Sequence, residues 1–226
     1  MLFHLILAEP PGVPTGFWRG VGPNSNVFAI ESFMDELAHQ AGKDPVAFRR
    51  DMLTQTPRLQ AAIDLAATQA GWGKPLPPRT GRGICAQTSF GSYIATVAEV
   101  EVTEAGMVRV KRLVTAVDTG IVVNPDSVVA QLQGGLIFGL TAALFGEITI
   151  KNGRVEQSNY HNYRVLRINE TPAIEVHLID STEPPGGIGE TGTTAAPPAV
   201  GNAIYAATGV RLRRLPIDSR QLVKKA

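Results

Sequence analysis

The stretch Glu183-Pro-Pro-Gly-Gly-Ile-Gly-Glu-Thr-Gly-Thr-Thr194 lies between a predicted strand at 173–180 and a predicted helix at about 196–208. Its Gly-x-Gly-x-x-Gly spacing is the one that binds phosphate at a helix start in dinucleotide-binding folds. That fold needs an acidic residue about twenty positions further on and a second strand after the helix. The chain offers neither, and Pro197-Pro198, in the first turn of the predicted helix, crowd its phosphate-facing start. We therefore reject a dinucleotide-binding fold.

Glu190 is the unusual residue of this stretch, because glycines surround it and no apolar neighbour covers it. The glycines let another molecule approach closely, and a nearby helix start favours the ionised carboxylate. A shielded carboxylate of this kind is suited to act as a general base. The spacing alone leaves an equal alternative, which is a surface glutamate that complements the helix dipole.

The first third of the chain is predicted to be helical. Residues 24–42 have apolar residues at helical spacing. Asp44-Pro45 and Thr56-Pro57 each join a capping residue to a first-turn proline, which predicts a short helix to about 53 and a third helix to about 71. Prolines at 75–78 then mark a linker. The apolar stripe of the first helix consists of Val27, Ile30, Met34, Leu37, Ala38 and Ala41, with Glu31 and Asp35 outside it.

The rest of the chain mixes strands and helices. Residues 93–102 and 107–114 predict a hairpin, with a strand at 82–89 before it. A second hairpin is predicted at 146–158 around Lys151-Asn-Gly153. The class is therefore α+β or mixed α/β. We expect two parts, an N-terminal helical segment at 1–75 and a C-terminal α/β domain at 76–226.

Asn124-Pro125 begins a predicted helix that continues to about 144 and is apolar on nearly all sides, so it should lie inside a protein. Its glycines at 134, 135 and 139 imply that another backbone or a ligand approaches closely. Gln131 and Gln133 need partners if they face inward, because an unpaired buried carboxamide costs about 1–3 kcal/mol. A neighbouring loop backbone is the simpler partner, and a polar ring system is the alternative.

Composition excludes several functions. The 226 residues, 44% of them hydrophobic, suit one large domain or two small ones. The 21 Lys+Arg and 20 Asp+Glu residues give no electrostatic reason to bind nucleic acid. The single cysteine, Cys85, excludes a cysteine-ligated cluster built by this chain alone and is expected to fill the core. The four histidines lack metal-ligand spacing.

The first residues, MLFHLILAEPPG, are too few to span a bilayer and lack a basic leader region, so we expect a strand there. No other stretch is expected to be a membrane helix. Before the first helix, the amides and Arg19 of Phe17-Trp-Arg-Gly-Val-Gly22 favour an anion. A turn with a solvent-facing arginine is the narrowly preferred alternative.

Together these stretches resemble the molybdenum hydroxylases, the family of xanthine dehydrogenase and aldehyde oxidase. Each motif is weak alone, but their order is that of the family. The wording of the chain is most similar to the C-terminal part of isoquinoline 1-oxidoreductase-type large subunits and related molybdopterin-binding aldehyde dehydrogenases. The motifs are Phe17–Gly22 for F-R-G-x-G, Ala116–Gly120 for V-x-D-x-G, Asn124-Pro125 for N-P, Gln131–Gly135 with Gly139-Leu140 for Q-x-x-G and G-L, and Gly189-Glu190 for G-E.

The resemblance implies an α+β fold, a partial molybdopterin-binding domain, and a set of roles. Glu190 would be the catalytic base, and Gln131 would hydrogen-bond the molybdopterin. Arg19, Gly20 and Gly189 would line the cofactor or pocket, with residues 1–75 supplying a cofactor-lining loop. No residue of this chain would ligate the metal.

The implied reaction is hydroxylation of an N-heterocycle or oxidation of an aldehyde, with water as the oxygen source. The cofactor would be molybdenum–molybdopterin, with the cytosine dinucleotide form as one option. Electrons would leave through a [2Fe-2S] cluster on a small iron–sulfur subunit, because this chain lacks the cysteines.

The chain departs from the family in lacking its E-M-G-Q-type pterin loop, so the site would be half built. We therefore expect the N-terminal part of the molybdopterin subunit as a second partner, and little activity from this chain alone. The alternative is a non-catalytic interaction module that kept the fold. Without a targeting signal on this chain, both a cytoplasmic and a periplasmic location are consistent with the sequence.

Overall fold

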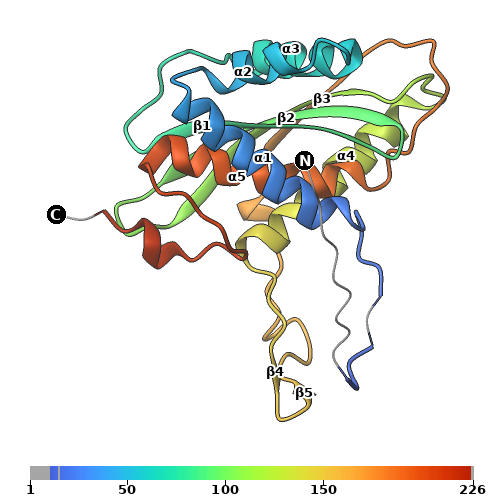
Figure 1. Cartoon of the computed structure of the whole chain (residues 1–226). Helices are drawn as coiled ribbons and strands as arrows, with labels where there is room; N and C mark the ends of the chain where they lie inside the picture. Colours follow the sequence, from blue (N-terminus) through green and yellow to red (C-terminus); the bar gives the residue numbers. More distant parts are fainter. Residues whose placement is uncertain (1–10, 15, 225–226) are drawn as a thin grey trace.

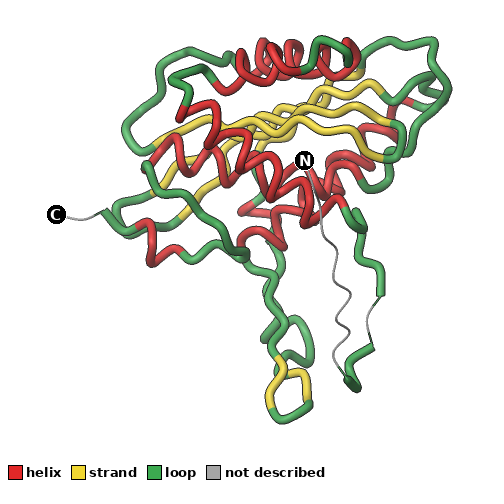
Figure 2. The backbone as a smooth tube through the Cα atoms, in the orientation of Figure 1, coloured by secondary structure: helices red, strands yellow, loops and turns green. Residues whose placement is uncertain are grey.

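A four-stranded sheet lies between two helical layers (Figure 1). The computed structural model describes residues 11–14 and 16–224. Helix α3 packs on one face of the sheet, and α5 packs on the other face, where α1 and α4 also contact it (Figure 2). The mixed helix-and-strand class is therefore confirmed. The strand expected at the start of the chain lies outside the described residues, and the division into 1–75 and 76–226 stays a prediction.

The sheet has the order β1-β2-β3-β6. Its first three strands are antiparallel, and β6 joins β3 in parallel. Phe90 and Gly91, with φ of 53° and 78°, form the two-residue turn between β1 and β2, and such turns match the twist of the strands. All four predicted strands are confirmed. The strands are β1 (Thr80–Ser89), β2 (Ser92–Val102), β3 (Val108–Asp118) and β6 (Ala173–Leu178).

The helices begin where their capping residues predict. The Asp44 carboxylate accepts from Val46 N and Ala47 N at 3.0 and 2.9 Å, and Asn124 Oδ1 accepts from Ser127 N at 3.1 Å. These bonds satisfy amides that a helix start leaves unpaired. The helices are α1 (Pro23–Gln40), α2 (Pro45–Met52), α3 (Pro57–Ala70), α4 (Pro125–Leu144) and α5 (Thr191–Thr208), with short 3-10 turns at Ile168–Glu170 and Ser219–Leu222.

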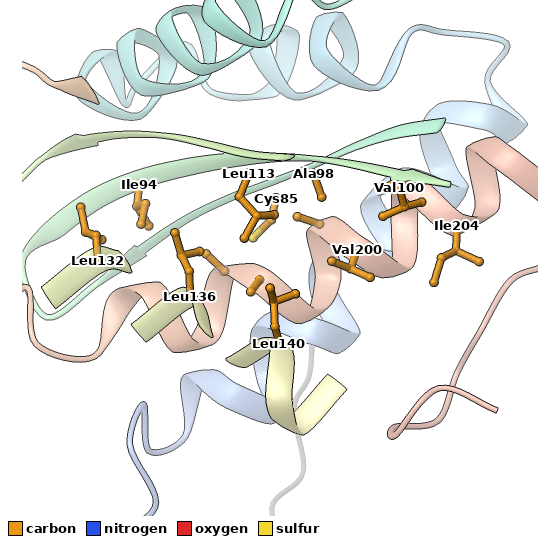
Figure 3. Packing of buried hydrophobic residues seen from close by; sticks show 14 of the residues in the cluster. Cys85, Ile94, Ala98, Val100, Leu113, Leu132, Leu136, Leu140, Val200 and Ile204 are labelled. Atoms are coloured by element: carbon orange, nitrogen blue, oxygen red, sulfur yellow. The ribbon is translucent and has the colours of Figure 1, made fainter. Parts of the chain in front are cut away.

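Two apolar cores lie on the two faces of the sheet. The core between the sheet, α4 and α5 is the larger (Figure 3). Cys85 is fully buried in it, as expected for a core-filling residue. The opposite core joins α3 to the alternate side chains of β1, β2 and β3. The labelled residues of Figure 3 are Cys85, Ile94, Ala98, Val100, Leu113, Leu132, Leu136, Leu140, Val200 and Ile204.

The predicted buried stripe of α1 is wrong. Glu31 and Asp35 are buried, whereas Ile30 and Leu37 are exposed. The inversion has an electrostatic cause, because each carboxylate meets an arginine from elsewhere. Arg211 Nη2 lies 2.7 Å from Asp35 Oδ2. Periodicity places apolar side chains inward, but it cannot reveal a distant arginine that compensates a buried charge.

Glu31 is the more deeply held of the two acids. Its Oε2 accepts from Arg49 Nε at 3.0 Å and from the Ala86 amide at 2.7 Å. Burial raises the pKa of Glu31 above its ordinary value, while the Arg49 charge and the Ala86 amide oppose that rise. This ion pair ties α1, α2 and β1 together.

The start of α5 also differs from the prediction. The helix begins at Thr191 rather than at 196, so Pro197 and Pro198 lie inside it, not in its first turn. The first-turn argument against dinucleotide binding was therefore misplaced. No strand follows α5 within 11–14 and 16–224, so the argument from the missing second strand remains. The glycine-rich sequence concealed a helical turn, because Gly192 has low helix propensity.

Helix α4 is buried on one side and open on the other. Leu132, Leu136 and Leu140 are fully buried, whereas Gln131 and Phe138 are exposed. The expectation of a helix buried on all sides is therefore half right. By length and composition α4 could also cross a membrane, contrary to our prediction, although its buried face packs against α5 as a core helix does.

The second predicted hairpin is shorter than expected. Its strands, β4 (Ile150–Lys151) and β5 (Arg154–Val155), have two residues each. They lie in an arm that projects away from the sheet (Figure 1). Ile148, Ile150 and Val155 are about half exposed there.

Replacing Arg49 by methionine tests the buried ion pair. We expect Arg49→Met to lower the free energy of unfolding by about 3–5 kcal/mol near neutral pH, because Glu31 is left buried and uncompensated. Loss of the cation raises the folded-state pKa of Glu31 further. The deficit should therefore grow as the pH rises through that pKa and shrink at lower pH. Urea unfolding at pH 5 and pH 8 measures it.

The neighbouring Arg50 is the matched control. It is exposed and pairs with Asp64 at the surface, so Arg50→Met should change stability little. Equal losses in the two variants, or a loss in Arg49→Met that does not vary with pH, would contradict the role of the buried pair.

Candidate functional site

Five residues singled out by the sequence meet in one place. Arg19 Nε donates to Gly189 O at 2.7 Å, and its Nη2 donates to Gln131 Oε1 at 2.9 Å and, more weakly, to Gln131 O at 3.3 Å. The Gly20 amide donates to Glu190 Oε1 at 3.1 Å. Residues 112 and 170 positions apart in the sequence are thus hydrogen-bonded neighbours. Their catalytic and cofactor-binding roles stay predictions.

A tight turn before α1 presents Arg19 and Gly20. Val21 N donates to Trp18 O at 2.8 Å to close the turn, and Asn24 Nδ2 donates to Arg19 O at 2.8 Å. Gly20 has φ of 105°, and a Cβ there would lie 2.3 Å from Asn24 Oδ1. The turn therefore requires glycine at this position, and its amide then faces Glu190.

The close approach of α4 and α5 brings Gln131 beside Glu190. A Cβ on Gly139 would lie 2.4 Å from Thr193 O, and a Cβ on Gly135 would lie 3.2 Å from Gly192 Cα. The sequence-based inference of close approach is confirmed for these two glycines, and the neighbour is another backbone. Gly134 differs, because nothing lies within 4 Å of its Cβ position.

Hydrogen bonds also fix the loop that leads to Glu190. Gly186 N donates to Thr119 O at 2.8 Å, and Gly187 N donates to Phe90 O at 2.6 Å. Ser92 Oγ donates to Gly187 O at 2.8 Å. The glycine-rich loop thus rests on the ends of β1, β2 and β3 rather than moving freely.

Asp118 supports this loop from the end of β3, which the sequence did not reveal. Arg58, in the first turn of α3, forms two bonds to its carboxylate, at 2.7 and 2.6 Å. Asp118 Oδ1 also accepts from Gly120 N at 3.0 Å. The Arg58 hydrogen bonds hold the pKa of Asp118 below its ordinary value. Nothing near Arg58 in the sequence announces a partner 60 positions away.

The site is open to its surroundings. Glu190 is half-buried, and Gln131 is exposed. A separate cleft of about 680 Å³ lies at the carboxyl ends of β3 and β6, between Asp118 and Glu183, and none of the five site residues lines it. Within the described part of the chain, no three His, Cys, Asp or Glu side chains gather to hold a metal. The arrangement offers a carboxylate, a carboxamide and a guanidinium on one surface.

Comparison with known proteins gives this arrangement a family. The sequence profile of the molybdopterin cofactor-binding domain matches residues 25–172, more than half of the chain. The chain belongs to the molybdopterin cofactor-binding domain family. The match includes Gln131 but ends before Glu190 and begins after Gly20, so the family assignment and the geometry of the site are separate observations.

Three curated relatives agree with the assignment. The chain is 37% identical to the membrane-bound aldehyde dehydrogenase [pyrroloquinoline-quinone] of Gluconacetobacter polyoxogenes, over 96% of this chain and 31% of that protein. It is 34% identical to the beta chain of isoquinoline 1-oxidoreductase from Brevundimonas diminuta, over 89% and 26%. It is 34% identical to a nicotinate dehydrogenase subunit of Pseudomonas putida, over 94% and 19%. The chain thus spans about a third or less of these relatives.

The fold agrees with a solved structure as well. The aldehyde oxidoreductase of Desulfovibrio desulfuricans superimposes with a TM-score of 0.74, over 92% of this chain and 41% of that chain. The sequence identity is 16%, so this likeness speaks for the fold alone. The predicted resemblance to part of a molybdenum hydroxylase is confirmed.

Two glycines of α4 provide a matched test of the contact that builds the site. Gly139→Ala should destabilise the chain by about 1–3 kcal/mol, because its Cβ collides with the α5 backbone. Gly134→Ala should be neutral or stabilise by up to about 1 kcal/mol, because alanine favours a helix and the space is open. Thermal unfolding measures both changes, and hydrogen exchange at 190–193 reports the site. Equal effects of the two substitutions would refute the close packing of the helices.

Proposed function

We propose that this chain supplies the general base and one wall of the molybdopterin site in a molybdenum hydroxylase. The enzyme would oxidise an aldehyde or hydroxylate an N-heterocycle, with water as the oxygen source. One observation carries the proposal: Arg19 and Gly20 hold the Glu190 carboxylate beside the exposed carboxamide of Gln131. The names of the relatives, an aldehyde dehydrogenase and two oxidising enzymes of nitrogen heterocycles, support these two substrate classes.

The residues present fit one side of a flat, polar cofactor. Gln131 is exposed on the open side of α4, and the space beyond Gly134 is empty. The start of α5 adds backbone amides, which favour anionic groups such as phosphates. Gln131 would hydrogen-bond the pterin, with Gly20 and Gly189 letting it approach. We include the cytosine dinucleotide form of the cofactor in the proposal.

Within such a site, the protein and the cofactor have separate tasks. The molybdenum centre, when bound, supplies the two-electron redox chemistry. Glu190 takes up a proton at its carboxylate as the oxygen of water is transferred, which is the work of a general base. Its hydrogen bond from Gly20 fixes the orientation of the carboxylate before the ligand arrives. The protein thus contributes a proton acceptor in a fixed position.

The surroundings of Glu190 support a covering partner. Trp18 stacks on Phe138 with ring centroids 4.9 Å apart, yet both rings remain partly exposed. Phe17 is 93% exposed beside them. Exposed aromatic clusters of this kind mark interaction sites. We propose that the N-terminal part of the molybdopterin subunit covers this surface and completes the site, and that a small [2Fe-2S] subunit receives the electrons.

The name of one relative, which includes pyrroloquinoline quinone, motivates a second candidate cofactor. Elemental analysis separates the two cofactors, because only the first contains molybdenum. We expect molybdenum when the chain is co-purified with its N-terminal counterpart and the iron–sulfur subunit. An assembled complex without molybdenum would contradict the proposed function and favour a non-catalytic interaction module or a quinone enzyme.

Glu190→Gln tests the base. The variant should retain molybdenum and lower kcat by about 10²–10⁴-fold, because glutamine keeps the shape and the Gly20 bond but cannot accept the proton. Glu183→Gln, at an exposed carboxylate of the same loop, is the control and should keep its turnover. Turnover of Glu190→Gln close to that of the wild type would remove Glu190 from the mechanism.

A further inference from the structure

We propose that Arg19 and Gly20 set the hydrogen-bond polarity of the site, so that Gln131 presents a donor and Glu190 presents an acceptor to the ligand. Arg19 is then a positioning residue rather than only a cofactor-lining one. The inference rests on the proposed function, because it describes how the same site meets its ligand. It follows from which atoms of the two side chains are already occupied.

Arg19 determines the orientation of the Gln131 carboxamide. A guanidinium has N–H donors and no acceptor, so the Gln131 atom at 2.9 Å from Arg19 Nη2 must be the carbonyl oxygen. This removes the usual ambiguity between the oxygen and nitrogen of an amide. The Gln131 Nε2 group, with two N–H donors, is left to face outward. A ligand atom that meets it must therefore be a hydrogen-bond acceptor.

The Gly20 amide determines the orientation of Glu190 in the same way. A backbone N–H can only donate, and it occupies Glu190 Oε1 at 3.1 Å. Oε2 is the remaining oxygen, so it is the atom that takes up the proton. Arg19 Nε also occupies the nearby Gly189 carbonyl at 2.7 Å, which removes a competing acceptor beside the base.

The two fixed groups define the ligand that fits. It offers an acceptor to Gln131 Nε2 and a proton to Glu190 Oε2. Arg19 connects the two sides because Nε and Nη2 are separate donors in a rigid plane, one for each segment. A lysine has one nitrogen at the end of a flexible chain and cannot reproduce this fork.

Amide hydrogen exchange in the 226-residue chain tests the orientation without any cofactor. The Gly20 amide should exchange slowly in the wild type and in Glu190→Gln, whose oxygen still accepts. It should exchange at least tenfold faster in Glu190→Ala and in Arg19→Lys. Unchanged amides in α3 show that each variant is folded. Equal Gly20 exchange in the wild type and Glu190→Ala would overturn the proposal.

Cofactor retention in the assembled complex tests the polarity. Gln131→Glu can still accept from Arg19 but has no donor for the ligand, so it should retain at least tenfold less molybdenum and pterin after gel filtration, as should Gln131→Leu. Gln133→Glu, two positions along the same helix, should retain both. Wild-type retention by Gln131→Glu would overturn the proposal. If wild-type complex binds no molybdenum, the proposed function fails, and the exchange experiment still decides the orientation.

Discussion

The contact between the backbones of α4 and α5 is the constraint on which the site depends. Pro197 has no N–H, so Thr193 O lacks its helical donor, and this oxygen lies where a Cβ on Gly139 would collide with it. Two turns earlier on α4 stands Gln131, and immediately before α5 stands Glu190. The spacing of the carboxamide and the carboxylate is therefore fixed by rigid helices rather than by a loop.

The third element of the site depends on buried charge. Arg19 lies in the turn just before α1, and α1 is fixed to the core by its buried acids, Glu31 with Arg49 and Asp35 with Arg211. A buried ion pair adds little net stability, but breaking it is costly. These pairs therefore hold α1 in one register on α5, so that the turn before it reaches Glu190.

The sequence predicted most of the fold, since capping side chains such as Asp44, β-branched runs and glycines act locally. It also selected the residues that meet at the site, through the order of weak motifs. It placed the acids of α1 wrongly, because Asp35 meets an arginine 176 positions away. It missed the pairing of Arg58 with Asp118 for the same reason. Interactions between distant charges have no local pattern from which to infer them.

Anomalous diffraction at the molybdenum absorption edge, from crystals of the chain assembled with its N-terminal counterpart and iron–sulfur subunit, tests the central claim most directly. The account predicts one strong peak beside the Glu190 carboxylate, on the side of α4 where Gln131 and the space beyond Gly134 are open. A peak remote from Glu190, or no peak in a complex that turns over substrate, would contradict it.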